Sequence, residues 1–417
     1  MCSKIGIVGT PDQISLLVPV LHSLHFKITA LWCKNLENCR KLAEKFRIPF
    51  AAANFKEVLL HPDVDLVYVA TEPGMHAEVA VKALTSGKHC ICQKPPSSRQ
   101  SEAQKMVSLS RYYNQLMSLL DSYMRFLPAI TKMRDLIVTG YCGKLHVVEA
   151  RVTMGSLIQQ EPYSWKCDPS VGGGVVNMLG SHLIDLVTFV SKQQAKKVHG
   201  TLNTFRPHTG NIQGYRTITS DDFCCFQMQC TEGLSATITL NTHAPGQYQF
   251  EFSVTGSNGR LVLKGVDLFG SKNNEAEVLL YKQDTEGCKM EDFGAPDTKF
   301  PATYYHQIMV GNRVMFTSLR SVLESRQLVR AVKGDRGEKP RMHSPPPSQI
   351  ANIPGPSATF EDGLYIRTVL DAIHMSNSTG QWVDIPKASL VEMDNDNPFW
   401  TSSNAEPSPK THRPVYV

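Results

Sequence analysis

The sequence has no concentrated cluster of basic residues and no long uninterrupted hydrophobic run. Its 417 residues carry a formal net charge of only +5, and no segment combines many lysines and arginines with interleaved aromatic residues. Nucleic-acid binding therefore has little support. No apolar stretch approaches the length of a membrane-spanning helix, and no signal peptide is evident. We expect a cytoplasmic protein that binds no membrane, with secretion as the alternative location.

A cysteine pattern suited to metal binding is also missing. Cys90 and Cys92 are too close together for the usual zinc pair, and no histidine-rich segment follows them. The 11 cysteines are scattered among expected strands and helices, which favours reduced thiols that behave as small apolar residues. No metal site is predicted.

The chain has an ordinary globular composition and enough length for two domains. Over the first 95 residues, short apolar runs typical of buried strands alternate with segments of helical periodicity. The expected strands cover 5–8, 27–32, 64–70 and 89–92, and the expected helices cover 14–24, 36–46 and 76–86. This alternation predicts an α/β unit with a parallel sheet, which we assign as a Rossmann domain over residues 1–122.

The pattern changes after residue 122, where the expected strands become longer. They cover 145–153, 197–205, 222–229, 234–241, 249–255 and 260–263, and the expected helices cover 129–138, 175–190, 304–332 and 361–376. These elements predict an α+β domain over residues 123–386. Prolines indicate a loop at 344–357, and residues 387–417 read as a polar tail.

The turn after the first expected strand is an incomplete phosphate-binding fingerprint. Gly9 occupies the first glycine position of the G-x-G-x-x-G pattern, but Pro11 and Ile14 stand at the second and third. Proline removes a donor N–H group that would face the pyrophosphate. Gly9 by itself is equally consistent with a tight turn, so the sequence leaves both interpretations open.

The end of the second expected strand lacks the acid that an NAD site usually places there for the ribose 2′-hydroxyl. The residues at this point are Trp32, Cys33 and Lys34, with Arg40 further along the chain. Lys34 can meet a 2′-phosphate, although a solvated loop lysine is the plainer interpretation. If a dinucleotide binds, NADP(H) is favoured over NAD(H).

Two groups of motifs resemble the Gfo/Idh/MocA oxidoreductases. The first is a strand that ends in Thr71-x-Pro73, followed by His76 and by Gly87-Lys88-His89 leading to Gln93-Lys94-Pro95. The second is a glycine run, 172–174, followed by His182 and Asp185. Segments 30–32, 124–129 and 218–224 are similar to the glucose-fructose oxidoreductase domain-containing proteins within that family.

This resemblance implies a Rossmann domain followed by an α+β domain with a large, mostly antiparallel open sheet. The substrate would lie between the domains, over the nicotinamide. Family substrates are mostly sugars and polyols, with hydride exchanged at a carbinol carbon. A homodimer or homotetramer that pairs through the open sheet is expected.

The resemblance also implies roles for two residues. Lys94 follows a parallel strand, where the family's lysine hydrogen-bonds the reacting hydroxyl and stabilises developing charge. His182 stands at the family's position for the general acid/base, and an imidazole suits that task near neutral pH. A surface lysine and a satisfied core histidine are the plainer interpretations.

Two departures weaken the resemblance. Gln93 replaces the acid of the family's Glu-Lys-Pro motif, and Met178 stands where the enzymes carry a substrate-holding Asp. Neighbouring Asn177 points about 100° away around a helix, and we interpret Asp185 as structural. The predicted cofactor-binding residues are Gly9, Thr10, Pro11, Trp32, Lys34, Arg40, Thr71, Pro73, His76, Gln93 and Lys94. The predicted substrate-site residues are Tyr123, Arg125, Trp165, Met178 and His182, although the aromatic residues can equally be packing.

The sequence leaves two functions open. The first is an NADP(H)-dependent oxidoreductase that acts on a sugar-like alcohol or carbonyl, supported by Lys94 and His182. The second is a nucleotide-binding pseudoenzyme that serves as a sensor or scaffold, supported by the incomplete glycine fingerprint, Gln93 and Met178.

Overall fold

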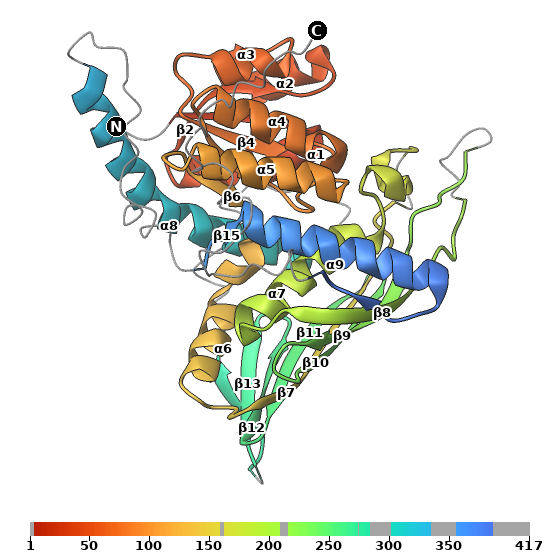
Figure 1. The fold of residues 1–417 in the computed structure, drawn as a ribbon. Helices are drawn as coiled ribbons and strands as arrows, with labels where there is room; N and C mark the ends of the chain where they lie inside the picture. The colour runs from red at the N-terminus through yellow and green to blue at the C-terminus, as the bar shows by residue number, and fades with distance from the viewer. Residues whose placement is uncertain are drawn as a thin grey trace, which may run out of the picture.

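The computed structural model describes residues 4–158, 162–208, 216–273, 275–283, 302–334 and 356–386. The predicted tail 387–417 and nearly all of the predicted loop 344–357 lie outside these ranges. The described chain forms two β-sheets, each with its own helices (Figure 1).

The first sheet has seven strands in the order β15-β6-β5-β4-β1-β2-β3, and only the β15–β6 pairing is antiparallel. Its middle strand β4 is buried along its whole length, because helices cover both faces of the sheet. The predicted Rossmann fold is therefore confirmed. The strands are β1 (Lys4–Gly9), β2 (Lys27–Trp32), β3 (Phe50–Ala51), β4 (Leu66–Ala70), β5 (His89–Cys92), β6 (Ser118–Leu120) and β15 (Ala358–Thr359). The helices are α1 (Pro11–Ser23), α2 (Leu36–Lys45), α3 (Phe55–Leu60), α4 (Pro73–Thr85) and α5 (Gln100–Tyr112).

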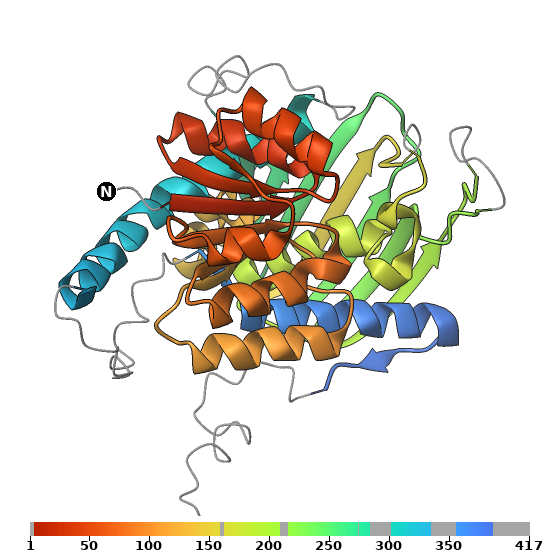
Figure 2. The same ribbon diagram turned by 90° about the horizontal axis from the view of Figure 1, so that it is seen from above.

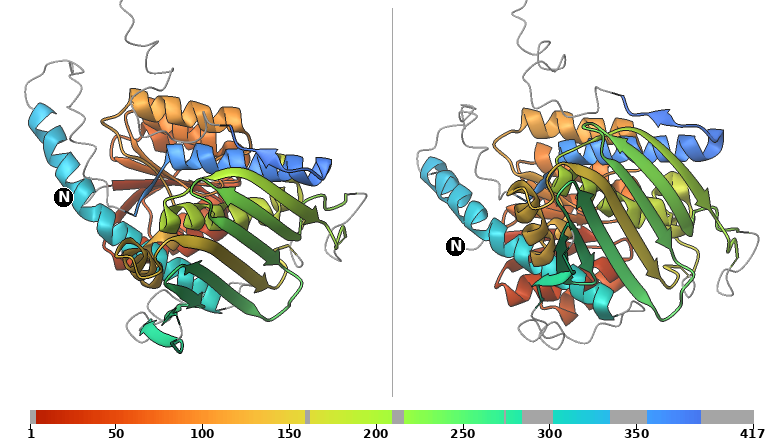
Figure 3. Two further views of the ribbon diagram at one scale, coloured as in Figure 1. Left: turned by 60° about the horizontal axis from the view of Figure 1, so that its bottom comes forward. Right: turned by 90° about the horizontal axis from the view of Figure 1, so that it is seen from below.

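The second sheet has nine strands in the order β14-β13-β12-β11-β7-β10-β9-β8-β16, and only the β7–β10 pairing is parallel. Side chains alternate along its strands: in β7, Val148 and Ala150 face the core, whereas Glu149 and Arg151 are exposed. Figure 3 shows this sheet from the side opposite its helices. The predicted mostly antiparallel sheet is confirmed. The strands are β7 (Leu145–Met154), β8 (Ala195–Asn203), β9 (Phe223–Cys230), β10 (Ser235–Asn241), β11 (Tyr248–Gly256), β12 (Gly259–Lys264), β13 (Asp267–Lys272), β14 (Val278–Tyr281) and β16 (Val383–Asp384). The helices are α6 (Pro128–Val138), α7 (Ser181–Ser191), α8 (Ala302–Gly334) and α9 (Phe360–Thr379).

The two halves of the chain are interlocked. The predicted boundary after residue 122 falls between β6 and a 3₁₀ turn, Tyr123–Phe126, but the chain later returns to the first sheet through β15. Helix α9 then packs on α5 and on β8, so it contacts elements of both sheets. Figure 2 shows α8 running alongside the first sheet, where it packs on α1.

One helical segment qualifies by length and composition as a candidate membrane span, contrary to our expectation of none. It covers Pro169–Ser191 and includes a π-helical turn, Val176–Gly180, that continues into α7. Of its most apolar 18-residue window, 89% is buried within the protein. Packing against the second sheet therefore accounts for its apolar character.

Phe316 of α8 joins the two halves through the aromatic core. Its ring lies 5.8 Å from that of Phe26 and 5.9 Å from that of Tyr68, and it is fully buried. We expect Phe316→Ala to lower the free energy of unfolding by about 3–5 kcal/mol, because the ring loses its contacts and leaves a cavity. Denaturant unfolding measures this. The neighbouring exposed Thr317→Ala is the control, and equal stability of the two variants would contradict the prediction.

Candidate active site

The candidate site lies at the carboxyl ends of β1, β4 and β5. In the first sheet, β2 and β3 lie on one side of β1, whereas β4, β5 and β6 lie on the other side. The strand order therefore reverses between β1 and β4. In open α/β sheets, this switch point is where a ligand-binding crevice forms. The predicted residues Gly9, Thr71, Pro73, Gln93 and Lys94 all lie at or just after these strand ends.

The turn after β1 brings the start of α1 close to β4. A Cβ atom at Gly9 would lie 3.2 Å from the Cβ of Ala70 and 3.3 Å from Cγ1 of Ile14, so only glycine fits without displacing its neighbours. Ile14, at the third position of the fingerprint, is fully buried against this turn. The strand-turn-helix geometry is thus retained although two of the three glycines are missing.

The N-termini of α1 and α4 suit an anion. Thr10 precedes α1 and Glu72 precedes α4, and neither side chain forms a cap hydrogen bond. By contrast, Asn35 and Asn54 cap α2 and α3, which begin away from the switch point. Uncapped N–H groups and the positive helix end favour a bound phosphate. The start of α1 therefore fits the pyrophosphate of a dinucleotide. Pro11, as the first helical residue, lacks only an N–H that would have no partner within the helix.

At the end of β2, the side chain of Lys34 is 84% exposed, and its Nζ lies 3.7 Å from Oε1 of Glu72. Arg40 is exposed on α2. The indole of Trp32 instead packs edge-on against Phe55, with 5.8 Å between the rings, and donates to the carbonyl oxygen of Ala53. Of these three predicted cofactor residues, Trp32 serves packing and the two cations lie at the surface.

His76 connects the turns that follow β4 and β5. It is buried, with Nδ1 2.8 Å from the carbonyl oxygen of Pro95 and Nε2 2.9 Å from that of Thr71. Burial lowers its pKa. Both ring nitrogens face backbone oxygens, so this side chain fixes the position of the Lys94–Pro95 turn relative to Thr71 and has no nitrogen left for a ligand.

Gln93 belongs to a polar network beneath the site. Its Nε2 donates to Oε1 of Gln13 at 2.9 Å and to the Tyr68 hydroxyl at 3.3 Å, and that hydroxyl donates to the buried Asp121. An amide can donate to both oxygens, which a carboxylate cannot do. The replacement of the family's acid by Gln93 is therefore compatible with the neighbouring Asp121.

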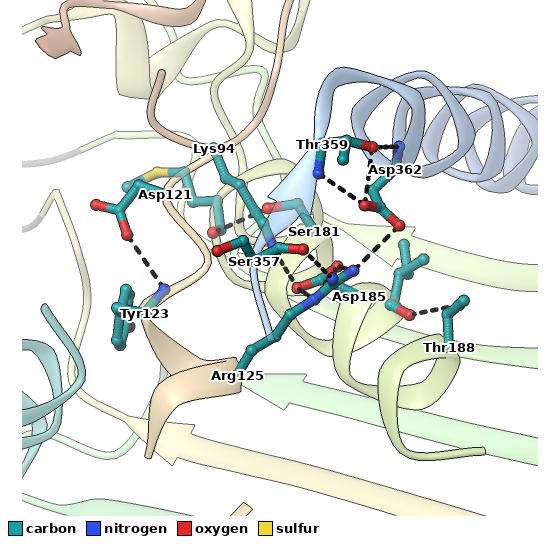
Figure 4. Close-up of polar contacts among 12 residues, drawn as sticks. Lys94, Asp121, Tyr123, Arg125, Ser181, Asp185, Thr188, Ser357, Thr359 and Asp362 are labelled. Atoms are coloured by element: carbon teal, nitrogen blue, oxygen red, sulfur yellow. Dashed lines mark hydrogen bonds and ion pairs between the residues drawn. The ribbon is translucent and has the colours of Figure 1, made fainter. Parts of the chain in front are cut away.

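Lys94 ends in a buried charge network that unites four segments (Figure 4). Its side chain has no exposed surface, and Nζ lies 2.5 Å from Oδ2 of Asp185 in α7. Arg125 binds the same carboxylate, with Nε 3.0 Å from both oxygens and Nη2 2.5 Å from Oδ1. The Arg125 guanidinium also lies 3.2 Å from Oδ1 of Asp362, which forms a capping box with Thr359 at the start of α9.

The network is balanced, with two cations and two carboxylates. Burial opposes ionisation of Asp185, but Arg125 and Lys94 outweigh it and hold the pKa of that carboxyl well below its usual range. Burial lowers the pKa of Lys94, and Asp185 counteracts this effect. Asp185 is therefore the centre of the network. The sequence signals for it are its place in the second family motif and its position one turn after His182 on an apolar helix.

His182 lies one turn before Asp185 on the same helix. Its ring lies 5.0 Å from that of Tyr123, and its Nδ1 is buried without a hydrogen-bond partner among the described residues. Burial, aided by the charge of Lys94, lowers the pKa of His182 to about 3. The ring is thus neutral near pH 7, and its protonated form is disfavoured by burial and by the charge of Lys94.

The segment before His182 contains Asn177 and Met178, at the place where the family carries an acid. Met178 lies one turn before His182 and is half-buried. Asn177 is fully buried; it donates to the carbonyl oxygen of Gly173 at 2.7 Å and accepts from Arg367 at 3.1 Å. Asn177 thus supports the glycine loop, and position 178 carries a methionine where the family has an Asp.

The glycine loop brings the second half of the chain onto the first. A Cβ atom at Gly172, whose φ is +96°, would lie 2.6 Å from Cβ of Pro73, so the loop rests directly on the start of α4. A Cβ at Gly173 would lie 2.5 Å from the carbonyl oxygen of Trp165. Trp165 is half-buried beside this loop, whereas Tyr123 and Arg125 are buried in packing and in the charge network.

Comparisons with known proteins agree with this architecture. Residues 3–119 match the family model for the oxidoreductase family with an NAD-binding Rossmann fold, and residues 130–262 match the GFO/IDH/MocA C-terminal domain. The chain is 40% identical over 401 residues to glucose-fructose oxidoreductase domain-containing protein 2 of Xenopus tropicalis, covering 96% of both chains.

Two solved structures share the fold at low identity. Levoglucosan dehydrogenase in complex with NADH and levoglucosan aligns with a TM-score of 0.71 at 19% identity, covering 92% of this chain and 99% of that one. A super-repressor mutant of Gal80p from Saccharomyces cerevisiae aligns with a TM-score of 0.70 at 14% identity, covering 93% and 99%.

Removal of the central carboxylate should destabilise the protein. Asp185→Asn leaves Lys94 and Arg125 as buried cations with a weakened partner, so we expect a loss of about 3–5 kcal/mol in the free energy of unfolding. Denaturant titration measures this loss. Glu251→Gln removes an acid from the exposed pair with Arg260 and should have little effect. A loss below about 1 kcal/mol for Asp185→Asn would show that the network contributes little.

His182 should make stability depend on pH. The His182 ring has a pKa near 6.5 in the unfolded protein and about 3 in the folded protein. Its contribution to the free energy of unfolding is therefore complete above pH 6.5 and is lost as the pH falls below 6.5. Between pH 7 and 5, His182→Gln should lose about 2 kcal/mol less stability than the wild type. Unfolding curves at both pH values test this, with the exposed His146→Gln as the control. Equal pH dependence of all three proteins would refute it.

Proposed function

The chain belongs to the Gfo/Idh/MocA oxidoreductase family, and on that basis we propose that it is an NADP(H)-dependent oxidoreductase for a sugar- or polyol-like substrate. The reaction is hydride transfer at a carbinol or carbonyl carbon. The observation that carries the proposal is the 2.5 Å contact of Lys94 with Asp185, because Asp185 lies one helical turn after His182 on α7. The charge of Lys94 therefore acts on the His182 ring, although the two residues come from different halves of the chain.

The residues that would hold the cofactor surround the switch point. The uncapped start of α1, at Thr10, would hold the pyrophosphate, and Lys34 would meet the 2′-phosphate of NADP(H). When bound, the nicotinamide supplies the acceptor or donor of hydride.

The protein's part in the reaction is to bind and move a proton. Lys94 would hydrogen-bond the oxygen of the reacting carbinol and stabilise its developing negative charge. Neutral His182 would accept the hydroxyl proton as the carbon–hydrogen bond breaks, and would return it in the reverse direction. Asp185 and Arg125 would hold Lys94 in place.

The substrate class rests on two supports. The family resemblance implies sugars and polyols, and the structurally similar dehydrogenase has been solved with levoglucosan and with L-sorbose. We further propose that the chain forms a homodimer or homotetramer through the open face of the second sheet. Light scattering on the purified protein tests the oligomeric state.

A second function is favoured by Met178 and by the closed charge network. With methionine in place of an acid, and with Lys94 already paired, the chain can bind a nucleotide without turnover and act as a sensor or scaffold. The fold also occurs in a protein described as a super-repressor mutant, so it is compatible with a regulatory role.

Turnover measurements separate the two functions. We expect the wild type to reduce NADP⁺ with at least one member of a panel of sugars and polyols that includes levoglucosan and L-sorbose. Lys94→Met and His182→Asn should each lower kcat by about 10²-fold or more, because each removes a group that acts on the transition state. Absorbance at the NADPH band follows the reaction.

The exposed Lys41→Met serves as the control and should retain full activity. Cofactor binding without turnover of any substrate would favour the sensor or scaffold. Absence of dinucleotide binding would reject both functions.

A further inference from the structure

We infer that Glu72 is the residue that limits selectivity for NADP(H) over NAD(H), acting through its ion pair with Lys34. This assignment rests on the proposed dinucleotide binding. The sequence shows no acid at the end of β2, where an acid usually contacts the ribose 2′-hydroxyl. The structure supplies one from the end of β4.

The geometry of the pair explains why its position matters. β2 and β4 are both neighbours of β1, so their ends lie two strand spacings apart, about 10 Å. Lys34 and Glu72 nevertheless approach to 3.7 Å, so their side chains extend toward each other across the turn at Gly9 and Thr10. The acid and the base thus reach the same place beside the predicted phosphate-binding turn.

Glu72 is free to interact with a ligand. Its side chain is 27% exposed, it makes no cap hydrogen bond, and it stands at the positive end of α4, which favours a negative charge. An ion pair this exposed adds little to stability. Glu72 therefore matters because of where it places a negative charge, and not because of the stability that the pair adds.

The two cofactors would meet this pair differently. The ribose 2′-hydroxyl of NAD(H) can donate to the Glu72 carboxylate while Lys34 remains paired. The 2′-phosphate of NADP(H) would bind Lys34 but would draw it away from Glu72 and leave two anions close together. Lys34 and Glu72 thus act in opposite directions, and the wild-type preference for NADP(H) is smaller than Lys34 alone would give.

The test is calorimetric titration of the full-length protein with NADPH and NADH. For Glu72→Gln we expect the ratio Kd(NADH)/Kd(NADPH) to rise about tenfold, because a like charge near the phosphate is removed. For Lys34→Gln we expect the ratio to fall about tenfold. Both shifts should shrink markedly in 1 M salt, since screening acts on charge and not on shape.

The matched controls are Glu37→Gln and Lys41→Gln, which alter the exposed pair on α2 with its 2.7 Å contact. They change the net charge of the same domain by the same amounts and should leave the ratio within about twofold of the wild type. An unchanged ratio in Glu72→Gln, or a shift equal to that of Glu37→Gln, would overturn the role of Glu72 while the proposed function stands. Failure of the wild type to bind either dinucleotide would instead overturn the proposed function, and this assignment with it.

Discussion

The buried carboxylate of Asp185 is the interaction on which the candidate site depends. It joins Lys94 from the turn after β5 to Arg125 from the turn after β6, and Arg125 continues to Asp362 at the start of α9. Buried charges persist only when they are paired, so each of these segments requires the others for its position. The junction between the two sheets is therefore a charge-balanced core, and the two halves of the chain are not independent units.

This network also shows which carboxylate pairs with Lys94 in a chain that has Met178 in place of an acid. In our interpretation of the family pattern, an acid there helps to hold the substrate and the protons. Here the negative charge nearest to Lys94 comes from Asp185, and Met178 leaves His182 without a neighbouring carboxylate on its preceding turn. His182 stays neutral because burial and Lys94 disfavour its charge. This arrangement supports a stable, closed junction, and proton acceptance by His182 belongs to the proposed reaction.

The turn at the switch point shows that an incomplete glycine motif can retain its geometry. Gly9 is kept because β4 approaches it closely, while Pro11 and Ile14 serve α1 as its first residue and as a packing residue. The uncapped starts of α1 and α4 do not depend on the lost glycines. In our proposal, cofactor selectivity then depends on the exposed pair of Lys34 and Glu72, which follow two different strands.

The sequence by itself determined the fold class and most strands and helices, because burial on one or both faces of an element produces a local periodicity in the chain. The roles of Lys94 and His182 were predicted from the family resemblance and not from periodicity, and they stay predictions. The sequence missed β3, β6, β15 and β16, which are only two or three residues long and carry no such pattern. It also missed the longer elements α3, α5, β13 and β14. Only the tertiary structure decided that Asp185 pairs with Lys94, that His76 holds two turns together and that Glu72 meets Lys34. These contacts join residues distant in sequence, and no local pattern records which side chains meet when strands and helices pack.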